Sequence, residues 1–368
     1  MSRTASLTLF LALTLLIGAA PNTIIAKASS TGWRSTSSAQ DDAVNIFSSN
    51  STSNETQWTG LSGAQGVAVG DLTNDGMQET AIAEGAAGRV TVVKSDGRTI
   101  VKQFTGLNNP FGVAIGDFSN DGLNEIAVAE TNGSRVDVLK IDGTVVKQFQ
   151  GLNQPVGVAI GDFNNDNLNE IAIAESGSGT VIVLKSDGSI VKQFTGFSQP
   201  EGVAIGDFSN DGLNEIAIAD SGANKVYVLR SDGTQVEEWD GLGHPVGVAI
   251  GDYDNLGLNE IAITETYPVG KVTVLADNGT IVANWTGRND PTGVAIGDIA
   301  NNGKNELAFT EVSNLTIEVS NQTSVPEFPS FTVVPALMAA TLVAMIIRRK
   351  YVVKPNSSFP TQTQDHQA

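Results

Sequence analysis

The sequence predicts an all-β fold, a six-bladed β-propeller closed by an N-terminal strand, followed by a C-terminal transmembrane helix. The prediction starts from a hexapeptide, Gly-Val-Ala-Val/Ile-Gly-Asp, that occurs six times. It ends at Asp71, Asp117, Asp162, Asp207, Asp252 and Asp298. Each repeat unit holds four short β patterns separated by turn residues such as Ser231-Asp232-Gly233. Four strands in about 45 residues is the size of one propeller blade.

The first 28 residues predict a secretory signal peptide. Arg3 supplies the positive start, residues 7–20 form an apolar run, and Ala26-Lys27-Ala28 is a small-residue cleavage pattern. A retained N-terminal anchor is the alternative, although the apolar run is short for a membrane span. Residues 29–55, rich in Ser, Thr and Asn, are expected to form a flexible leader.

The second strand of each unit alternates large and small apolar residues. In unit four, Ile216 and Ile218 point to one side of the strand, and Ala217 and Ala219 point to the other. A bulky face that packs on the small face of the next sheet allows sheets to stand radially at close spacing. Both faces are then buried, as propeller blades require. Gly and Ala in the innermost strand allow six strands to surround a narrow axis.

Ring closure is predicted from a displaced strand. The propeller is expected to span residues 56–320, and its sixth unit ends after a third strand at residues 315–320. The missing fourth strand precedes the first unit, where residues 56–61 match residues 102–107. An N-terminal strand that completes the last blade would remove both sheet edges. An open stack of repeats is the alternative, but it would not need this strand.

The loop between the first and second strands carries the cation chemistry. Oxygen ligands at loop positions 1, 3, 5 and 9, with the carbonyl of position 7, can surround a hard cation such as Ca²⁺. In unit two these are Asp117, Ser119, Asp121, Leu123 and Glu125. Gly122 permits the sharp turn that brings them together. The alternative is that Asp and Gly only form Asx turns here, with no ion.

These residues also carry a family resemblance. The motif Gly-Asp-Phe-x-Asn-Asp-Gly-Leu-Asn-Glu-Ile-Ala resembles the FG-GAP and VCBS repeats of integrin α-chain propellers and microbial surface proteins. The resemblance covers all six units and implies one calcium ion per intact loop, on the face opposite the usual ligand face. The third and fourth strands, as in residues 225–234, are also similar to NHL-type propellers.

The six loops are unequal when the motif is carried over position by position. Units one to four keep a usable ligand set: Asp71, Thr73, Asp75, Met77 and Glu79; Asp117, Ser119, Asp121, Leu123 and Glu125; Asp162, Asn164, Asp166, Leu168 and Glu170; Asp207, Ser209, Asp211, Leu213 and Glu215. Asn167 replaces the turn glycine in unit three, which Asn tolerates. Unit five keeps Asp252, Asp254 and Glu260 but has Leu256 at position 5, so we expect an incomplete site. Unit six, with Ala300 and Asn302 at positions 3 and 5, is expected to be empty.

A second recurring carboxylate ends the second strand of each unit. The six acids are Glu84, Glu130, Glu175, Asp220, Glu265 and Glu311. A ring of acids could bind a cationic ligand, but cross-strand pairing is the preferred interpretation. The expected basic partners of four of them are Arg89, Arg135, Lys225 and Lys271. Glu175 and Glu311 have no evident basic partner.

The loops that join one blade to the next vary most in sequence. Variable loops on a repeated scaffold are where a partner would be recognised. The possible ligand face therefore comprises Phe111, Val156, Glu201, His244 and Asp290.

The C-terminal end predicts a membrane anchor. Residues 321–330 form a linker with a Pro-Glu-Phe-Pro motif, residues 331–347 an apolar transmembrane helix, and residues 348–368 a basic stop and cytoplasmic tail. A buried core helix is the alternative. The motif, span and arginines resemble the PEF-CTERM sorting tails of archaeal surface proteins, which implies processing by a membrane transpeptidase. Such tails usually stop soon after the basic residues, so a retained span is the second interpretation.

Composition narrows the function classes. A net charge of −19 disfavours nucleic-acid partners, and the chain has no cysteine for disulfide or thiolate chemistry. It has two histidines, and His366 lies in the tail, so no nucleophile–base set is evident. We expect a non-catalytic, calcium-binding surface module that recognises an extracellular protein or glycan. The alternatives are a secreted propeller lyase or hydrolase, or a component of a glycosylated cell coat. Glycosylation sequons stand at Asn50, Asn54, Asn132, Asn278, Asn284, Asn314 and Asn321.

Overall fold

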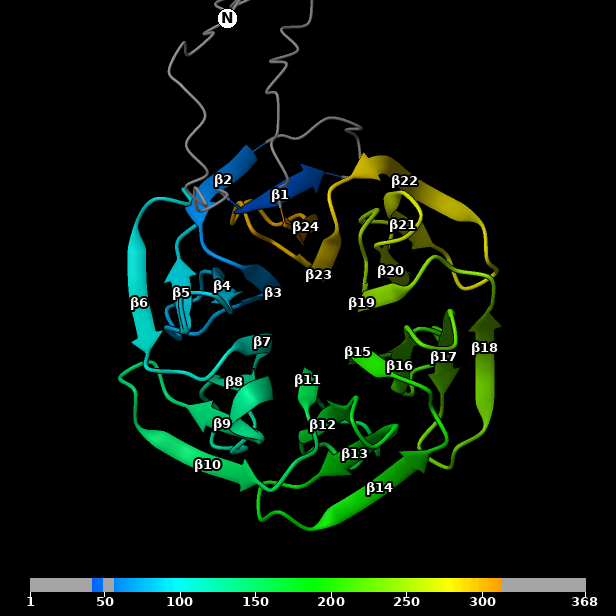
Figure 1. The fold of residues 1–368 in the computed structure, drawn as a ribbon, viewed down its shortest axis with the longest axis horizontal. Helices are drawn as coiled ribbons and strands as arrows, with labels where there is room; N and C mark the ends of the chain where they lie inside the picture. The colour runs from blue at the N-terminus through cyan, green and yellow to red at the C-terminus, as the bar shows by residue number, and fades with distance from the viewer. Residues whose placement is uncertain (1–41, 49–55, 313–368) are drawn as a thin grey trace, which may run out of the picture. The chain divides into compact units, whose positions relative to one another are not determined.

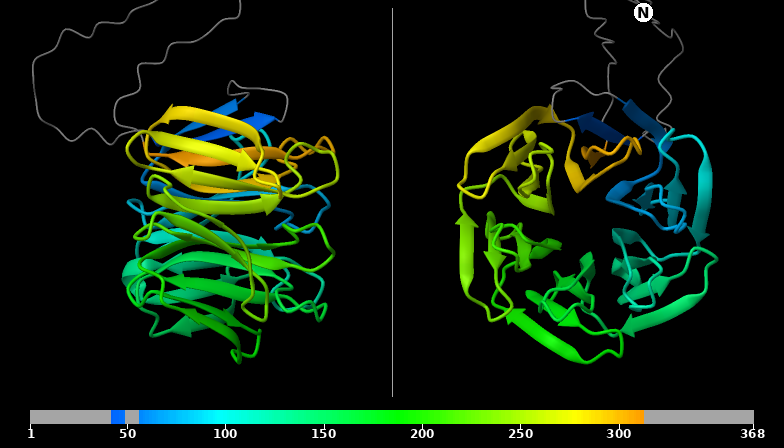
Figure 2. Two further views of the ribbon diagram at one scale, coloured as in Figure 1. Left: turned by 90° about the vertical axis from the view of Figure 1, so that its right-hand side faces the viewer. Right: turned by 180° about the vertical axis from the view of Figure 1, so that it is seen from behind.

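The computed structural model describes residues 42–48 and 56–312. They form six four-stranded antiparallel sheets that stand radially around a central axis (Figure 1). Figure 2 shows the same ring from behind and from the side. The predicted all-β, six-bladed propeller is therefore confirmed. The predicted signal peptide, linker, transmembrane helix and tail lie outside the described residues, and within these residues no helix is long and apolar enough to cross a membrane.

Five blades use four consecutive strands, the first nearest the axis and the fourth at the rim (Figure 1). Blade one comprises β3 (Ala64–Gly70), β4 (Glu79–Glu84), β5 (Arg89–Val93) and β6 (Ile100–Thr105). Blade two comprises β7 (Pro110–Gly116), β8 (Glu125–Glu130), β9 (Arg135–Leu139) and β10 (Val145–Gln150), with a 3₁₀ turn at Thr131–Gly133. Blade three comprises β11 (Pro155–Gly161), β12 (Glu170–Glu175), β13 (Thr180–Leu184) and β14 (Ile190–Thr195). Blade four comprises β15 (Pro200–Gly206), β16 (Glu215–Asp220), β17 (Lys225–Leu229) and β18 (Gln235–Trp239). Blade five comprises β19 (Pro245–Gly251), β20 (Glu260–Glu265), β21 (Gly270–Leu275) and β22 (Ile281–Arg288).

The sixth blade combines strands from both ends of the propeller. Its order from axis to rim is β23 (Pro291–Gly297), β24 (Glu306–Glu311), β1 (Asp42–Ser48) and β2 (Thr56–Leu61). The outermost strand, β2, is the predicted closing strand. Its pairing with β1 confirms that an N-terminal segment completes the last blade.

The third strand of this blade corrects two expectations. The prediction of a flexible leader is wrong for residues 42–48, because β1 pairs with β24 along its length, from Ala43 opposite Glu311 to Ser48 opposite Glu306. The third-strand place expected for residues 315–320 is therefore held by β1, and residues 315–320 lie outside the described part of the chain.

Packing explains why a short N-terminal segment takes this place. Val44 and Ile46 belong to the apolar cluster shared with blade one, whereas Phe47 belongs to the cluster shared with blade five. Val44 and Phe47 are completely buried. Because β1 contributes to both neighbouring cores, it closes the ring by apolar burial as well as by backbone hydrogen bonds.

Each pair of neighbouring blades packs a large face on a small one. Ile216 and Ile218 lie in the cluster that contains Ala172 and Ala174 of blade three. Ala217 and Ala219, on the other side of β16, lie in the cluster of blade five. All of these side chains are fully buried. The predicted alternation of large and small faces is confirmed.

The axis requires glycine at one point of each inner strand. A Cβ atom on Gly112 would stand 2.3 Å from the carbonyl oxygen of Val156, in the next blade. A Cβ on Gly293 would stand 2.6 Å from the carbonyl oxygen of Gln65, which closes the circle from blade six to blade one. No side chain fits at these distances, so the inner strands approach closely only through glycine.

Candidate functional site

The two candidate regions lie at opposite ends of the inner strands. The acidic loops leave the carboxyl ends of the first strands, as Asp117 does directly after β7. The blade-joining loops enter the amino ends of the same strands, where Phe111 stands. The propeller therefore presents its acidic loops on one face and its variable loops on the other.

The acidic loops share one geometry, which unit two illustrates. Asp117 accepts hydrogen bonds from the N–H of Asp121 at 3.0 Å and of Gly122 at 2.8 Å. Glu125 is completely buried and accepts from both the N–H and the hydroxyl of Ser119, at 3.0 and 2.9 Å. Gly122 has a φ of +87°, as the sharp turn requires. The loop residues thus converge on the two carboxylates that begin and end the motif.

Asparagine residues connect each loop to the next, which the sequence analysis did not predict. The N–H of Asn169 donates to the side-chain oxygen of Asn120 at 2.7 Å, and its side-chain amide donates to the Asp117 carbonyl at 2.8 Å. Equivalent links run between all six loops, and Gln78 joins Asn301 where the ring closes. The signal was the asparagine at loop position 4 in all six units. These hydrogen bonds join the six acidic loops into one continuous ring, which we call the asparagine girdle.

In units two to four a basic side chain neutralises the position 5 aspartate. Lys140 contacts Asp121 at 3.0 Å, Lys185 contacts Asp166 at 2.9 Å, and Arg230 contacts Asp211 at 2.7 Å. The lysine ammonium groups lower the pKa of the aspartates that they contact. Each basic residue directly follows the third strand of its blade. A metal ion in these loops would have to displace this contact.

Unit five departs from this arrangement. Leu256 replaces the aspartate, and Ala276 stands where units one to four have a basic residue. Asp254 supplies a carboxylate at position 3 instead, so one oxygen each of Asp252, Asp254 and Glu260 lies within 4.8 Å of the others. Burial, followed by the charges of the two aspartates, raises the pKa of Glu260 to about 6. Among the described residues, this is the one such cluster of three carboxylates.

The carboxylate oxygens therefore gather in a different loop from those that the ligand count favoured. The sequence placed complete ligand sets in units one to four, but there the carboxylate oxygens do not gather as they do in unit five. An all-oxygen set with three carboxylates fits a hard cation such as Ca²⁺. In unit six, position 5 is Asn302 and not an aspartate. Its neutral side-chain amide donates to Glu306 at 3.1 Å, so this loop has one carboxylate fewer.

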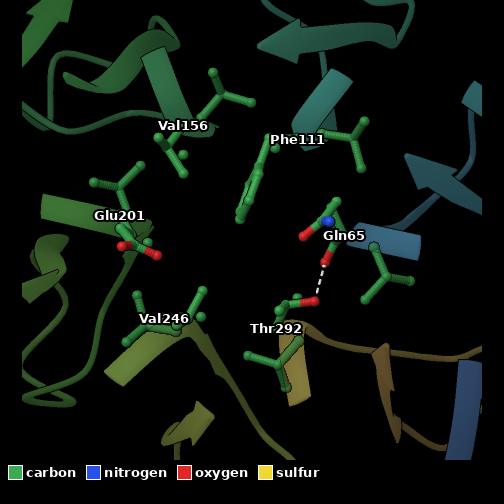
Figure 3. A pocket seen from close by; sticks show the side chains of 18 residues that line it. Gln65, Phe111, Val156, Glu201, Val246 and Thr292 are labelled. Atoms are coloured by element: carbon green, nitrogen blue, oxygen red, sulfur yellow. Dashed lines mark hydrogen bonds between the residues drawn. The ribbon is translucent and has the colours of Figure 1, made fainter. Parts of the chain in front are cut away.

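The opposite face carries a small cavity of about 60 Å³ on the axis. Each inner strand contributes the same three-residue segment, in which a variable residue precedes glycine and valine. The six variable residues are Gln65, Phe111, Val156, Glu201, Val246 and Thr292 (Figure 3). Three of them, Phe111, Val156 and Glu201, belong to the ligand face predicted from the sequence.

The other predicted face residues lie outside this cavity. The ring nitrogen Nδ1 of His244 lies 3.1 Å from the hydroxyl of Thr266, and Asp290 occupies a turn with a φ of +42°. The ligand face predicted from the sequence did not include Gln65, Val246 and Thr292, although each directly precedes the repeated Gly-Val-Ala. Register in the inner strand, and not variability of the loop, selects the residues that meet at the axis.

Comparison with known proteins finds one family that matches part of the chain. Residues 162–218 match the family described as FG-GAP-like repeat. The chain is a β-propeller that carries an FG-GAP-like repeat. The matched segment begins at the acidic loop of unit three and ends in β16 of blade four. A search of curated proteins found no match.

Two solved structures are similar to this chain at low sequence identity. A catalytically inactive virginiamycin B lyase from Staphylococcus aureus with quinupristin is 16% identical, with a TM-score of 0.50, and the match covers 76% of this chain and 97% of that chain. BBS1N in complex with ARL6DN is 12% identical, with a TM-score of 0.48, over 75% of this chain and 98% of that chain. At 16% identity the likeness to the lyase shows the fold alone.

The propeller uses its second set of acids for structure. Each acid at the end of a second strand accepts the backbone N–H of the residue 22 positions earlier, as Glu84 does from Ser62 at 3.0 Å. Equivalent bonds reach Glu130, Glu175, Asp220, Glu265 and Glu311. The acids therefore hold the blade-joining loops in place, and the interpretation that preferred pairing to a ligand ring is supported.

The predicted ion pairs of these acids form in three of four cases. Arg89 contacts Glu84 at 2.6 Å, and the pairs Arg135–Glu130 and Lys271–Glu265 both measure 2.7 Å. The expected pair Lys225–Asp220 is wrong, because Lys225 bonds to Glu238 on the neighbouring strand β18. Asp220 instead accepts the N–H groups of Ser198 and Gln199.

Proposed function

We propose that this chain is a non-catalytic, calcium-binding propeller that is exported to the cell surface and recognises an extracellular protein or glycan through its axial face. The observation that supports this most directly is the asymmetry of the axial ring. Glycine and valine repeat in all six inner strands, whereas the residue before them is Gln, Phe, Val, Glu, Val or Thr. A uniform scaffold with five different residue types at six equivalent positions has the form of a recognition surface.

Export and anchoring are proposed from the two ends of the sequence. The apolar run at residues 7–20 supports secretion, and the apolar run at residues 331–347 with Arg348-Arg349-Lys350 supports a membrane span. Both segments lie outside the described residues. With the basic cluster inside the cell, the propeller would face outward and meet extracellular concentrations of calcium.

Calcium is proposed to bind first at unit five. Asp252, Asp254 and Glu260 would hold the ion, and its charge would offset the repulsion among three carboxylates. The ion would stabilise the loop that the asparagine girdle links to its neighbours on both sides. This assigns calcium a scaffold role on the face opposite to recognition.

Calcium at 10 mM should stabilise the full chain by about 1.4–2.7 kcal/mol, if the dissociation constant is on the order of 10⁻⁴–10⁻³ M as in extracellular modules. Thermal unfolding with and without calcium measures this. Asp254→Asn should abolish the shift because it removes one of three carboxylates, whereas Asp277→Asn, an exposed control in the same blade, should retain it. A shift that persists in Asp254→Asn would assign the ion to another loop, and no shift in the natural protein would refute calcium binding.

The recognition role predicts a difference between two apolar-to-alanine variants. Phe111→Ala changes the axial face and should reduce capture of the full chain on glycan and protein arrays at least tenfold. Ile190→Ala changes an exposed residue at the rim of blade three and should leave capture unchanged. Equal capture by the two variants would place recognition elsewhere, and turnover of an arrayed glycan would favour an enzyme.

A further inference from the structure

Glu201 is the one ionisable residue among those that line the axial cavity. It is 8% exposed, and its oxygen Oε1 accepts hydrogen bonds from Gln199 at 2.7 Å and from Ser221 at 2.8 Å. Within the described part of the chain, its second oxygen, Oε2, accepts no hydrogen bond. The carboxylate is thus oriented by one oxygen and available to a ligand through the other.

Among the described residues Glu201 forms no ion pair, so its charge is offset only by two neutral donors and by the attraction of His244. Burial raises the pKa of Glu201, His244 lowers it by attraction, and Asp220 raises it by repulsion. Burying a charge without a partner costs stability, so its retention at the axis needs a compensating role. With a net charge of −19, the protein also attracts cations toward the cavity.

The residues that line the cavity restrict the kinds of ligand that it can bind. Figure 3 shows the side chains of Phe111, Val156 and Val246 around the same space as the Glu201 carboxylate. Aliphatic walls suit methylene groups, and an aromatic ring can attract a cation. A divalent metal ion would need six or more oxygen ligands, whereas the lining offers a single carboxylate. The small volume favours a slender chain over a ring.

We propose that the axial cavity binds a protonated primary amine on an aliphatic chain, such as a lysine side chain of a partner protein or a free alkylamine. The ammonium group would bond to Oε2 of Glu201, and the methylene groups would contact Val156 and Val246. Phe111 would lie near the ammonium group across the cavity. This inference rests on the proposed function, because it specifies how the recognition face would bind a partner.

Calorimetric titration of the full chain with n-butylammonium tests the proposal, with 1-butanol as a neutral ligand of similar shape. We expect n-butylammonium to bind at least tenfold more tightly than 1-butanol. Glu201→Gln should weaken n-butylammonium at least tenfold, whereas Asp240→Asn, which removes an exposed charge in the same blade, should change it less than twofold. Equal binding of amine and alcohol, equal binding by Glu201→Gln, or no binding to the natural protein would overturn the proposal.

A second titration distinguishes the two sources of the amine. Nα-acetyl-lysine methylamide represents a lysine side chain within a polypeptide, and n-butylammonium represents a free amine. Tighter binding of the lysine derivative would support a protein partner, and tighter binding of the free amine would support a small metabolite. If amines bind but the arrays capture nothing, the site stands and the proposed recognition of a macromolecule fails.

Thermal unfolding provides a check that is independent of ligand. Without an amine, Glu201→Gln should melt on the order of 2 °C higher than the natural protein at pH 7.5, because no charge is buried. A raised folded-state pKa means that the cost of the carboxylate is present at high pH and disappears as the pH falls through that pKa. The difference should therefore vanish near pH 4. A variant that is less stable at pH 7.5 would show that the carboxylate serves the fold.

Discussion

Replacing Phe47 by alanine should lower the free energy of unfolding by about 3–5 kcal/mol, the usual cost of removing a large aromatic side chain from a core. Phe47 is completely buried in β1. Its ring centroid lies 4.8 Å from that of Trp285 and 5.4 Å from that of Phe309, and Arg288 covers the ring at 5.1 Å. The change would empty a space between blades five and six, where the ring closes.

Denaturant unfolding followed by tryptophan fluorescence measures this effect, since Trp285 reports on the same contact. Ile281→Ala is the control, because Ile281 is 59% exposed at the rim of blade five and its loss should cost less than about 0.5 kcal/mol. If Phe47→Ala were as stable as the control, residues 42–48 would not hold the third-strand place, and the expectation of a flexible leader would return.

The fold was largely predictable because the repeat constrains it at several levels. The hexapeptide spacing predicts the number of blades, the Ile216–Ala219 alternation predicts their packing, and residues 56–61 predict ring closure. The strand at residues 42–48 lies on the same period, because Val44 stands 46 residues before Val90 of β5, the offset that also separates Trp58 from Phe104. It was missed because it lies within a Ser/Thr/Asn-rich segment that resembles a flexible leader in composition. Its contacts with both neighbouring cores identify it as the third strand.

The candidate metal site was less predictable, because ligand counting considered each loop alone. The pair Lys140 and Asp121 is 19 residues apart in sequence, and only the pairing of the strands brings the two together. Counting also gave weight to the missing aspartate at Leu256, whereas unit five gathers its carboxylates through Asp254 and has Ala276 in the place of a basic residue. The sequence predicts which residues could bind a cation, but it does not show that in units two to four a basic residue next to the third strand contacts the position 5 aspartate.

Prediction from the sequence was limited in the same way for the axial ring, on the opposite face of the propeller. Loop variability directed attention to His244 and Asp290, whereas the strand register places Gln65 and Thr292 at the axis. The hydroxyl of Thr292 donates to the backbone carbonyl of Gln65 at 2.7 Å, so this hydroxyl is already bonded within the protein. Glu201 is the one ionisable residue at the axis, and its oxygen Oε2 accepts no hydrogen bond within the described part of the chain.

Replacing Arg89 by methionine should lower the free energy of unfolding by about 2–4 kcal/mol. Glu84 is completely buried, and Arg89 bonds to both of its oxygens, at 2.7 and 2.6 Å. The variant would leave a buried carboxylate that only Thr91 and Ser62 contact, both of them neutral donors. Removing one partner of a buried pair usually costs about 3–5 kcal/mol, and the side chain of Arg89, 33% exposed, reduces that figure.

Chemical denaturation of Arg89→Met and two further variants would show whether the stability of the fold depends on the ion pair between Arg89 and Glu84. Arg98→Met is the control, because Arg98 is exposed in the same blade and its loss should cost less than about 0.5 kcal/mol. The double variant Glu84→Gln with Arg89→Met should recover stability relative to Arg89→Met alone, since it removes the unpaired charge. An Arg89→Met protein as stable as the control would mean that Glu84 does not depend on this pair. The second-strand acids would then be free to bind a cationic ligand, and recognition would not be confined to the axial cavity.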